Sequence, residues 1–164
     1  KIIPNVKLIV LFRNPVDRAY SNYHLGIRDG SENLSFEDAI QSELDSLKNS
    51  KIKSDDDVKK YTIPRSYIAK GFYADQLKIW LKLFKSKQLF ITSTEDFESN
   101  ANNTLNKIYD FLEIPQINLK NLEKHKVASY PPMKDETRKF LVDLYKIHNE
   151  ELFRMISKEF DWNK

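Results

Sequence analysis

The sequence has no cysteine, only three glycines and no long apolar run. Without cysteine, a disulfide framework and a thiolate metal site are both excluded. No apolar stretch approaches the roughly 18 residues that a membrane-spanning helix needs. The glycines, at positions 26, 30 and 71, form no cluster of the kind that cradles a phosphate. The three histidines are dispersed, so we predict no metal site.

The composition is that of an ordinary globular protein. Of its 164 residues, 40% are hydrophobic and 31% are charged, which suits a single domain over residues 1–164 with a real core. The net charge of +3 is modest and the lysines are scattered, so we predict no nucleic-acid interface. No signal peptide is visible, and we expect a cytoplasmic protein.

The segment from Lys7 to Ser21 is the most informative part of the chain. Its apolar run, residues 8–12, predicts a strand covered on both faces, as in a parallel sheet. Asn14 is a good N-cap and Pro15 suits the first helical position, so a helix is predicted to follow. Arg13 then lies at the carboxyl end of the strand, where open α/β sheets bind ligands.

This corner is also suited to an anion. Asn14, Arg18 and Ser21 are spaced i, i+4 and i+7, and are therefore predicted to share one face of the helix. A guanidinium, a hydroxyl and the free N–H groups of a helix start can together bind a phosphate. On these residues alone, an arginine paired with a carboxylate beside an ordinary capped helix explains the pattern equally well.

The remaining elements follow from hydrophobic spacing. The pattern predicts a second helix capped by Ser35, a polar loop over 49–60, a helix over 73–84, a strand over 89–92, and helices over 103–112 and 135–156. Trp80 and Trp162 are predicted to lie in the core. Short strands among more numerous helices indicate a helix-rich α/β fold.

The nine residues from Arg13 to Ser21, Arg-Asn-Pro-Val-Asp-Arg-Ala-Tyr-Ser, resemble the 3′-phosphate-binding segment of sulfotransferases. These enzymes use 3′-phosphoadenosine 5′-phosphosulfate (PAPS) as donor, and the greater similarity is to heparan-type carbohydrate sulfotransferases and their bacterial relatives. The resemblance implies that Arg13 and Ser21 hold the 3′-phosphate. It also implies a P-loop-like parallel sheet flanked by helices. Further similar stretches are Glu32–Ile40, Gly71–Trp80, Gln88–Phe97 and Tyr130–Arg138.

One loop departs from the heparan-type pattern. Members of that group carry Lys-Gly-Arg shortly before a Tyr-Pro pair, and this loop closes over the nucleotide. Here Lys126 and Tyr130 remain, but the glycine and arginine do not. The resemblance implies nucleotide contacts from Lys126, Ser129 and Tyr130. Because Val127 does not readily take a positive φ, we expect the loop to follow a different path.

The acceptor is less well defined. The resemblance implies a hydroxyl or amine acceptor, with carbohydrate as the leading class, and makes His24 and Tyr73 candidates for contacting it. For His24 the competing interpretation is a surface residue on the same helix. For Tyr73 it is packing beneath the amphipathic helix that it opens.

The resemblance also implies parts that this sequence does not contain. The first strand, the lysine-bearing glycine-rich loop for the 5′-phosphosulfate and the general base would all precede residue 1. We therefore expect the C-terminal portion of a sulfotransferase, inactive by itself, with its catalytic residues upstream and no metal. Two alternatives stay open. One is a non-catalytic or decayed nucleotide-binding module, and the other is a nucleotide-kinase-like phosphotransferase that would prefer a 5′-triphosphate and need Mg²⁺.

Overall fold

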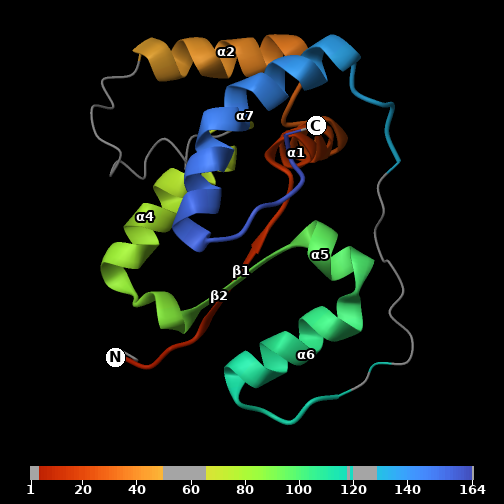
Figure 1. Cartoon of the computed structure of the whole chain (residues 1–164). Helices are drawn as coiled ribbons and strands as arrows, with labels where there is room; N and C mark the ends of the chain where they lie inside the picture. The colour runs from red at the N-terminus through yellow and green to blue at the C-terminus, as the bar shows by residue number, and fades with distance from the viewer. Residues whose placement is uncertain (1–3, 50–65, 118, 120–128, 164) are drawn as a thin grey trace. The chain divides into compact units, whose positions relative to one another are not determined.

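The computed structural model describes residues 4–49, 66–117, 119 and 129–163 (Figure 1). These residues form a helix-rich α/β fold with a small parallel sheet, as the sequence predicts. The polar loop predicted over 49–60 lies outside the described residues, apart from its first residue. The chain divides into two compact units, Lys1–Arg13 with Leu81–Ser129, and Asn14–Trp80 with Tyr130–Lys164.

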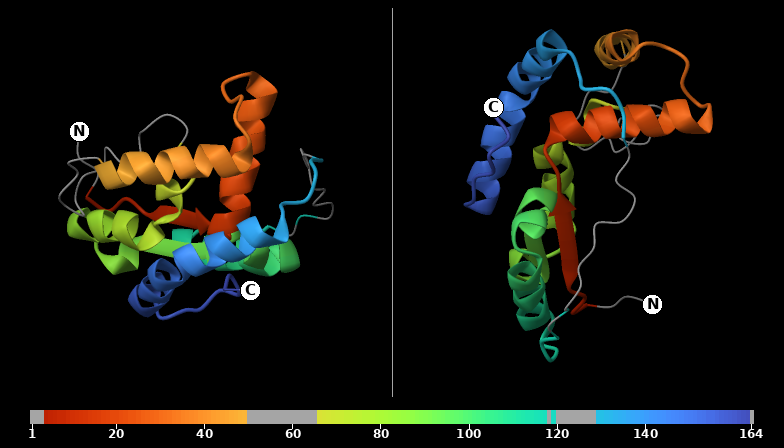
Figure 2. Two further views of the ribbon diagram at one scale, coloured as in Figure 1. Left: turned by 90° about the horizontal axis from the view of Figure 1, so that it is seen from above. Right: turned by 90° about the vertical axis from the view of Figure 1, so that its right-hand side faces the viewer.

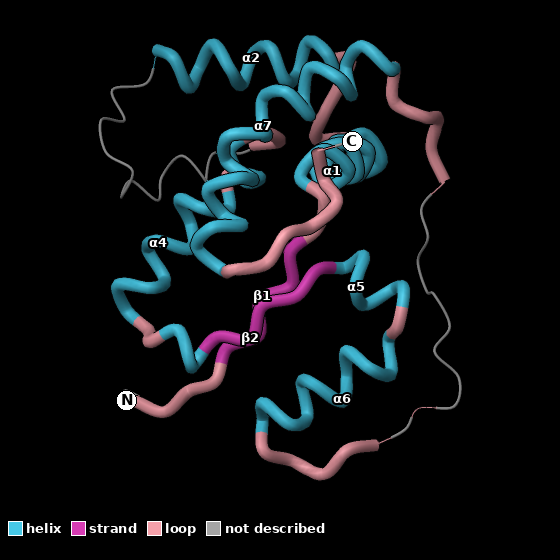
Figure 3. The backbone as a smooth tube through the Cα atoms, in the orientation of Figure 1, coloured by secondary structure: helices cyan, strands magenta, loops and turns pink. Residues whose placement is uncertain are grey.

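The first unit is built on two parallel strands. β1 (Leu8–Phe12) pairs with β2 (Leu89–Ser93) in a register that sets Leu8 opposite Leu89 and Phe12 opposite Ser93 (Figure 3). Both strands therefore end at the same edge of the sheet. A 3₁₀ turn, η2 (Ser86–Gln88), leads into β2.

Two helices follow β2 in this unit. The Ser93 side chain accepts the Asp96 N–H at 3.0 Å and so caps α5 (Thr94–Ser99), a short helix that the sequence did not predict. Next comes α6 (Ala101–Leu112), which packs Phe111 against Phe90 of β2, with ring centroids 5.6 Å apart. A helix thus covers part of the strand pair.

One sequence expectation about β1 is wrong. The strand is not covered on both faces, because Ile9 and Leu11 are 46% and 52% exposed. Successive side chains of a strand point to opposite faces, so these two residues share one face, while Leu8 and Val10 on the other are half-buried. An unbroken apolar run therefore did not mark a strand buried within this chain.

The second unit is helical. α1 (Pro15–Asp29) begins at Asn14, whose side-chain oxygen accepts the Val16 N–H at 3.0 Å. It ends at Gly30, which takes the left-handed φ of 75° that favours glycine. α2 (Phe36–Asn49) begins after Ser35 and crosses α1 at a steep angle (Figure 2). The Ser35 hydroxyl accepts the Asp38 N–H at 3.1 Å, so the predicted cap is confirmed.

The remaining elements are the 3₁₀ turn η1 (Ala69–Gly71), α4 (Tyr73–Leu83), which runs on into the first unit, and α7 (Asp135–Ile156). The bounds of α7 are those that the spacing predicts. The core of the second unit contains Val16, Ala19, Tyr23, Phe36, Ala39, Ile40, Tyr67, Ile68, Leu141 and Tyr145. Trp162 is 1% exposed, as predicted, but Trp80 is 49% exposed, so its assignment to the core is wrong.

Candidate functional site

The corner between β1 and α1 has the predicted local structure. Arg13 is half-buried and follows the last residue of β1 directly. Asn14 caps α1 through the Val16 N–H, and Pro15 occupies the first turn. Asp17, in that turn, pairs with Arg138 of α7 at 2.6 Å. Negative charge near a helix N-terminus is favourable, and here the same carboxylate also ties α1 to α7.

Ser21 lies farther along α1 and is half-buried. Its hydroxyl makes no hydrogen bond with any residue that the structure describes. Arg18, which the sequence grouped with Ser21 in one anion site, has another partner. Its Nη2 donates to the backbone carbonyl of Tyr67. Buried carbonyl groups are normally hydrogen-bonded, so this nitrogen of Arg18 serves the fold, whereas the Ser21 hydroxyl has no partner among the described residues.

The first turn of α7 and the residue before it contact α1 and α2. Lys134, the N-cap position of α7, forms an ion pair with Glu37 of α2 at 3.2 Å. The Thr137 hydroxyl donates to the same carboxylate at 2.7 Å and is the main reason why the pKa of Glu37 lies below its ordinary value. Together with the pair of Asp17 and Arg138, these contacts hold the start of α7 in place.

Tyr20, His24 and Tyr130 form an aromatic cluster beside α1. The His24 imidazole stacks on the Tyr130 ring with centroids 4.3 Å apart and an angle of 6° between the planes. The Tyr20 ring meets both rings edge to face, and its hydroxyl donates to the Pro131 carbonyl at 2.9 Å. Burial lowers the pKa of His24. His24 is therefore neither a plain surface residue nor an isolated one.

A buried carboxylate that the sequence analysis missed organises the segment before η1. Glu43 of α2 is 8% exposed and accepts four hydrogen bonds. The donors are the Ser66 hydroxyl at 2.8 Å and the backbone N–H groups of Tyr67, Ile68 and Ala69 at 2.5, 2.7 and 2.9 Å. One signal was available, because Glu43 lies on the apolar stripe of α2, seven residues after Phe36.

The carbonyl groups of the same segment are satisfied from the other side. The Tyr145 hydroxyl of α7 donates to the Ile68 carbonyl at 3.0 Å and lies 3.4 Å from the Tyr67 carbonyl, which also accepts from Arg18. Burial raises the pKa of Tyr145, so its hydroxyl stays protonated and remains a donor. Residues 66–69 are thereby fixed by α1, α2 and α7 together.

The close approach of η1 to α7 predicts that Gly71→Ala destabilises the domain. A Cβ at position 71 would lie 2.7 Å from the Tyr145 ring, and Tyr145 is fully buried with its hydroxyl engaged. We expect the free energy of unfolding to fall by about 1–3 kcal/mol, as in other overpacked cores. Urea denaturation measures it. In a Tyr145→Leu background the same substitution should cost less, and an equal cost in both backgrounds would contradict this explanation.

The other predicted site residues fall in different places. Tyr73 is 7% exposed and packs its ring edge to face against Trp162 at 5.9 Å, which favours packing over contact with an acceptor. Tyr130 is half-buried in the aromatic cluster, and Ser129 is exposed. Lys126 lies outside the described residues. Within the described part of the chain, no cluster of histidine, cysteine and carboxylate side chains could hold a metal ion.

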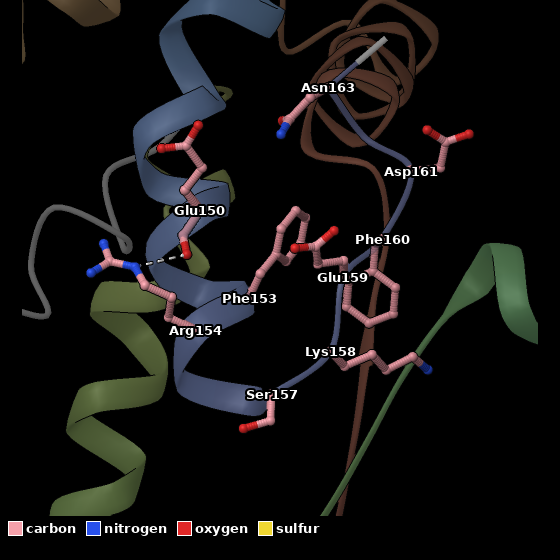
Figure 4. A pocket seen from close by; sticks show the side chains of 9 residues that line it. All are labelled: Glu150, Phe153, Arg154, Ser157, Lys158, Glu159, Phe160, Asp161 and Asn163. Carbon is pink, nitrogen blue, oxygen red and sulfur yellow. Dashed lines mark hydrogen bonds between the residues drawn. The ribbon is translucent and has the colours of Figure 1, made fainter.

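A separate hollow of about 790 Å³ lies at the end of α7 (Figure 4). Glu150, Arg154 and Lys158 line it beside Phe153 and Phe160. The Arg154 Nε donates to the Glu150 carbonyl at 3.3 Å, and the two phenylalanines are each only 8% exposed. Acidic and basic groups are thus mixed with apolar surface around this hollow, and none of the predicted site residues lines it.

Comparison with known proteins identifies the family of this chain. The sulfotransferase domain matches residues 2–164. The chain belongs to the sulfotransferase domain family. Carbohydrate sulfotransferase 15 of Homo sapiens is 27% identical to it over 176 residues, which cover 97% of this chain and 31% of that protein. The membrane-associated sulfotransferase kil1 of Dictyostelium discoideum is 32% identical over 95 residues, 58% of this chain and 20% of that one.

The fold is shared with a solved member. A crystal structure of a sulfotransferase from Alicyclobacillus acidocaldarius superposes with a TM-score of 0.75 at 24% identity, covering 96% of this chain and 57% of that one. This sulfotransferase domain therefore spans a third or less of the curated relatives named above and over half of the solved one. Among the described helices, none is both long and apolar enough to cross a membrane.

Proposed function

We propose that this sulfotransferase domain takes part in sulfuryl transfer from PAPS to a hydroxyl or amine of a carbohydrate. The observation that carries the proposal is the Ser21 hydroxyl, which has no hydrogen-bond partner among the described residues and lies in a stretch that resembles the 3′-phosphate-binding segment of sulfotransferases. The proteins that resemble this chain include carbohydrate sulfotransferase 15 and bifunctional heparan sulfate N-deacetylase/N-sulfotransferase 2, which supports a carbohydrate acceptor.

The residues present fit the 3′-phosphate of the donor. Arg13 offers a guanidinium at the carboxyl end of a parallel strand, and such a group binds phosphate oxygens in pairs. Ser21 offers a half-buried hydroxyl with no described competitor for its hydrogen bond. In this proposal the two residues select a nucleotide with a 3′-phosphate over AMP or ATP, and they hold the donor in place for the transfer. Positioning of this kind is a large part of catalysis in group-transfer reactions.

The test is calorimetric titration of the protein with 3′-phosphoadenosine 5′-phosphate (PAP), with AMP and ATP–Mg²⁺ as comparison ligands. Ser21→Ala should weaken PAP binding by about 1–3 kcal/mol, or about 5- to 150-fold, because a hydrogen bond to a charged group is lost. The matched control is Ser42→Ala, an exposed helical serine on α2, which should leave the affinity unchanged.

Three results would contradict parts of this proposal. Equal affinity for PAP and AMP would contradict the proposed 3′-phosphate site. A preference for ATP–Mg²⁺ would favour the kinase-like alternative. PAP binding that is insensitive to Ser21→Ala would remove Ser21 from the site while leaving the nucleotide preference intact.

A further inference from the structure

His24 lies on the same face of α1 as Ser21. Asp17, Tyr20, Ser21 and His24 are spaced i, i+3, i+4 and i+7, which brings them to one side of the helix. Tyr130 and Pro131 contact this face through Tyr20 and His24. Ser21 therefore lies between two residues that hold another segment of the chain.

The ring of Tyr130 is held from two directions. His24 stacks on it with parallel planes at 4.3 Å, and Tyr20 meets it edge to face at 5.4 Å. The next residue, Pro131, is fixed by the hydrogen bond from the Tyr20 hydroxyl. The Tyr23 ring contacts the His24 ring edge to face, with centroids 5.1 Å apart. Stacked and edge-to-face pairs of this kind restrict both rings to one arrangement.

We propose that His24 is a positioning residue for the nucleotide site. It holds Tyr130 against the face of α1 that carries Ser21. The inference rests on the proposed function, because the site that it serves is the one that binds the 3′-phosphate. It assigns His24 no contact with the acceptor or with the phosphate. His24 acts through the ring on which it stacks.

The surroundings of His24 support a neutral, stacked imidazole. Its Nε2 is buried and has no hydrogen-bond partner among the described residues, and burial lowers its pKa. The titratable or charged groups in and around this cluster are the phenols of Tyr20, Tyr23 and Tyr130 and the side chains of Glu32, Glu37 and Lys134. Glu37 is paired with Lys134, and Glu32 accepts hydrogen bonds from two backbone N–H groups and the Tyr67 hydroxyl, so neither carboxylate is committed to an imidazolium.

Calorimetry with PAP on four variants tests the inference. We expect His24→Ala to weaken PAP binding about fivefold to tenfold, the scale of a lost aromatic pair. His24→Phe keeps a ring that can stack and should bind PAP within about twofold of the wild type. Tyr130→Ala should weaken binding as much as His24→Ala or more. In the double variant, His24→Ala should add no further loss, because His24 acts through Tyr130.

A pH series on the wild type and His24→Phe gives a readout that a purely structural role would not move. Below the ordinary histidine pKa of about 6.5, protonation of His24 opposes the buried stack, so wild-type affinity should fall relative to His24→Phe. Comparing the two proteins at each pH cancels the titration of the ligand's own phosphate. The control variant is His148→Ala, which removes a histidine that packs on Phe72, away from this face, and should keep PAP affinity.

Each result of these titrations has a different meaning. If His24→Phe binds as weakly as His24→Ala, or if acid strengthens wild-type binding, His24 contacts the ligand through its nitrogen and the inference is overturned. If His24→Ala binds like the wild type while PAP is still preferred to AMP, only the positioning role fails. If the wild type does not prefer PAP to AMP, the proposed function fails and the inference falls with it.

Discussion

Replacing Glu43 with alanine is expected to lower the free energy of unfolding by about 3–5 kcal/mol, the largest stability effect that we expect in this domain. The carboxylate is buried and accepts three consecutive backbone N–H groups and one hydroxyl, so its removal takes away an acceptor that four donors share in the core. A buried N–H group that loses its acceptor no longer has a hydrogen bond to replace the one that it made with water in the unfolded chain. Partial rearrangement or water entry would recover some of the cost, which is why the expected loss is smaller than four separate penalties.

Urea denaturation followed by circular dichroism measures this effect. The matched control is Asp45→Ala, an exposed acid two residues farther along α2, which should change stability by less than about 0.5 kcal/mol. The free energy of unfolding of Glu43→Gln should lie between those of Glu43→Ala and the wild type. The amide oxygen can still accept N–H groups, but the amide NH₂ faces other donors. A Glu43→Ala protein as stable as the Asp45→Ala control would contradict the role assigned to this carboxylate.

Replacing Arg13 with alanine is expected to weaken PAP binding by about 100-fold or more while AMP binding changes by less than about twofold. Under the proposed function, the guanidinium binds the 3′-phosphate through charge-assisted hydrogen bonds, which contribute about 1.5–3 kcal/mol each. AMP has no 3′-phosphate, so it should not sense the change. The ratio of the two affinities, rather than either alone, is the diagnostic quantity.

Two further variants sharpen this experiment. Arg13→Lys keeps the charge but loses the planar fork, so it should recover only part of the PAP affinity. Arg28→Ala removes an exposed arginine from the last turn of α1 and should leave both affinities unchanged. An equal loss for PAP and AMP in Arg13→Ala would instead assign Arg13 a role in holding the fold.

Local signals in the sequence predicted much of this structure. The strand, cap and helix from Leu8 to Asp29 follow from an apolar run, an N-cap residue and a proline at the first helical position. The bounds of α7 follow from hydrophobic spacing alone. The family motif then indicated Ser21, whose hydroxyl the structure leaves available to a ligand. The predictions of strand, cap and helix succeed because each depends on residues that are close together in the chain, and the role of Ser21 stays a prediction.

Contacts between distant segments could not be predicted in this way. Arg18 was grouped with Ser21 by spacing, but the carbonyl that it satisfies belongs to Tyr67, far away in the sequence. Trp80 is apolar and correctly spaced on α4, yet the face that it occupies is half exposed. The stack of His24 on Tyr130 depends on where the segment before α7 returns to α1. Spacing fixes the face of a helix on which a residue lies, and tertiary packing decides what meets that face.

The pairing of Leu8 with Leu89 constrains the order in which this chain can fold. Parallel strands cannot pair until the connection between them has turned back, and residues 14–80 of the second unit all lie within that connection. Closing so long a loop costs entropy before any hydrogen bond between the strands compensates for it. Helix α1, by contrast, starts from its own cap. It follows that the helix that carries Ser21 can form early, whereas the strand that leads into Arg13 acquires its partner late.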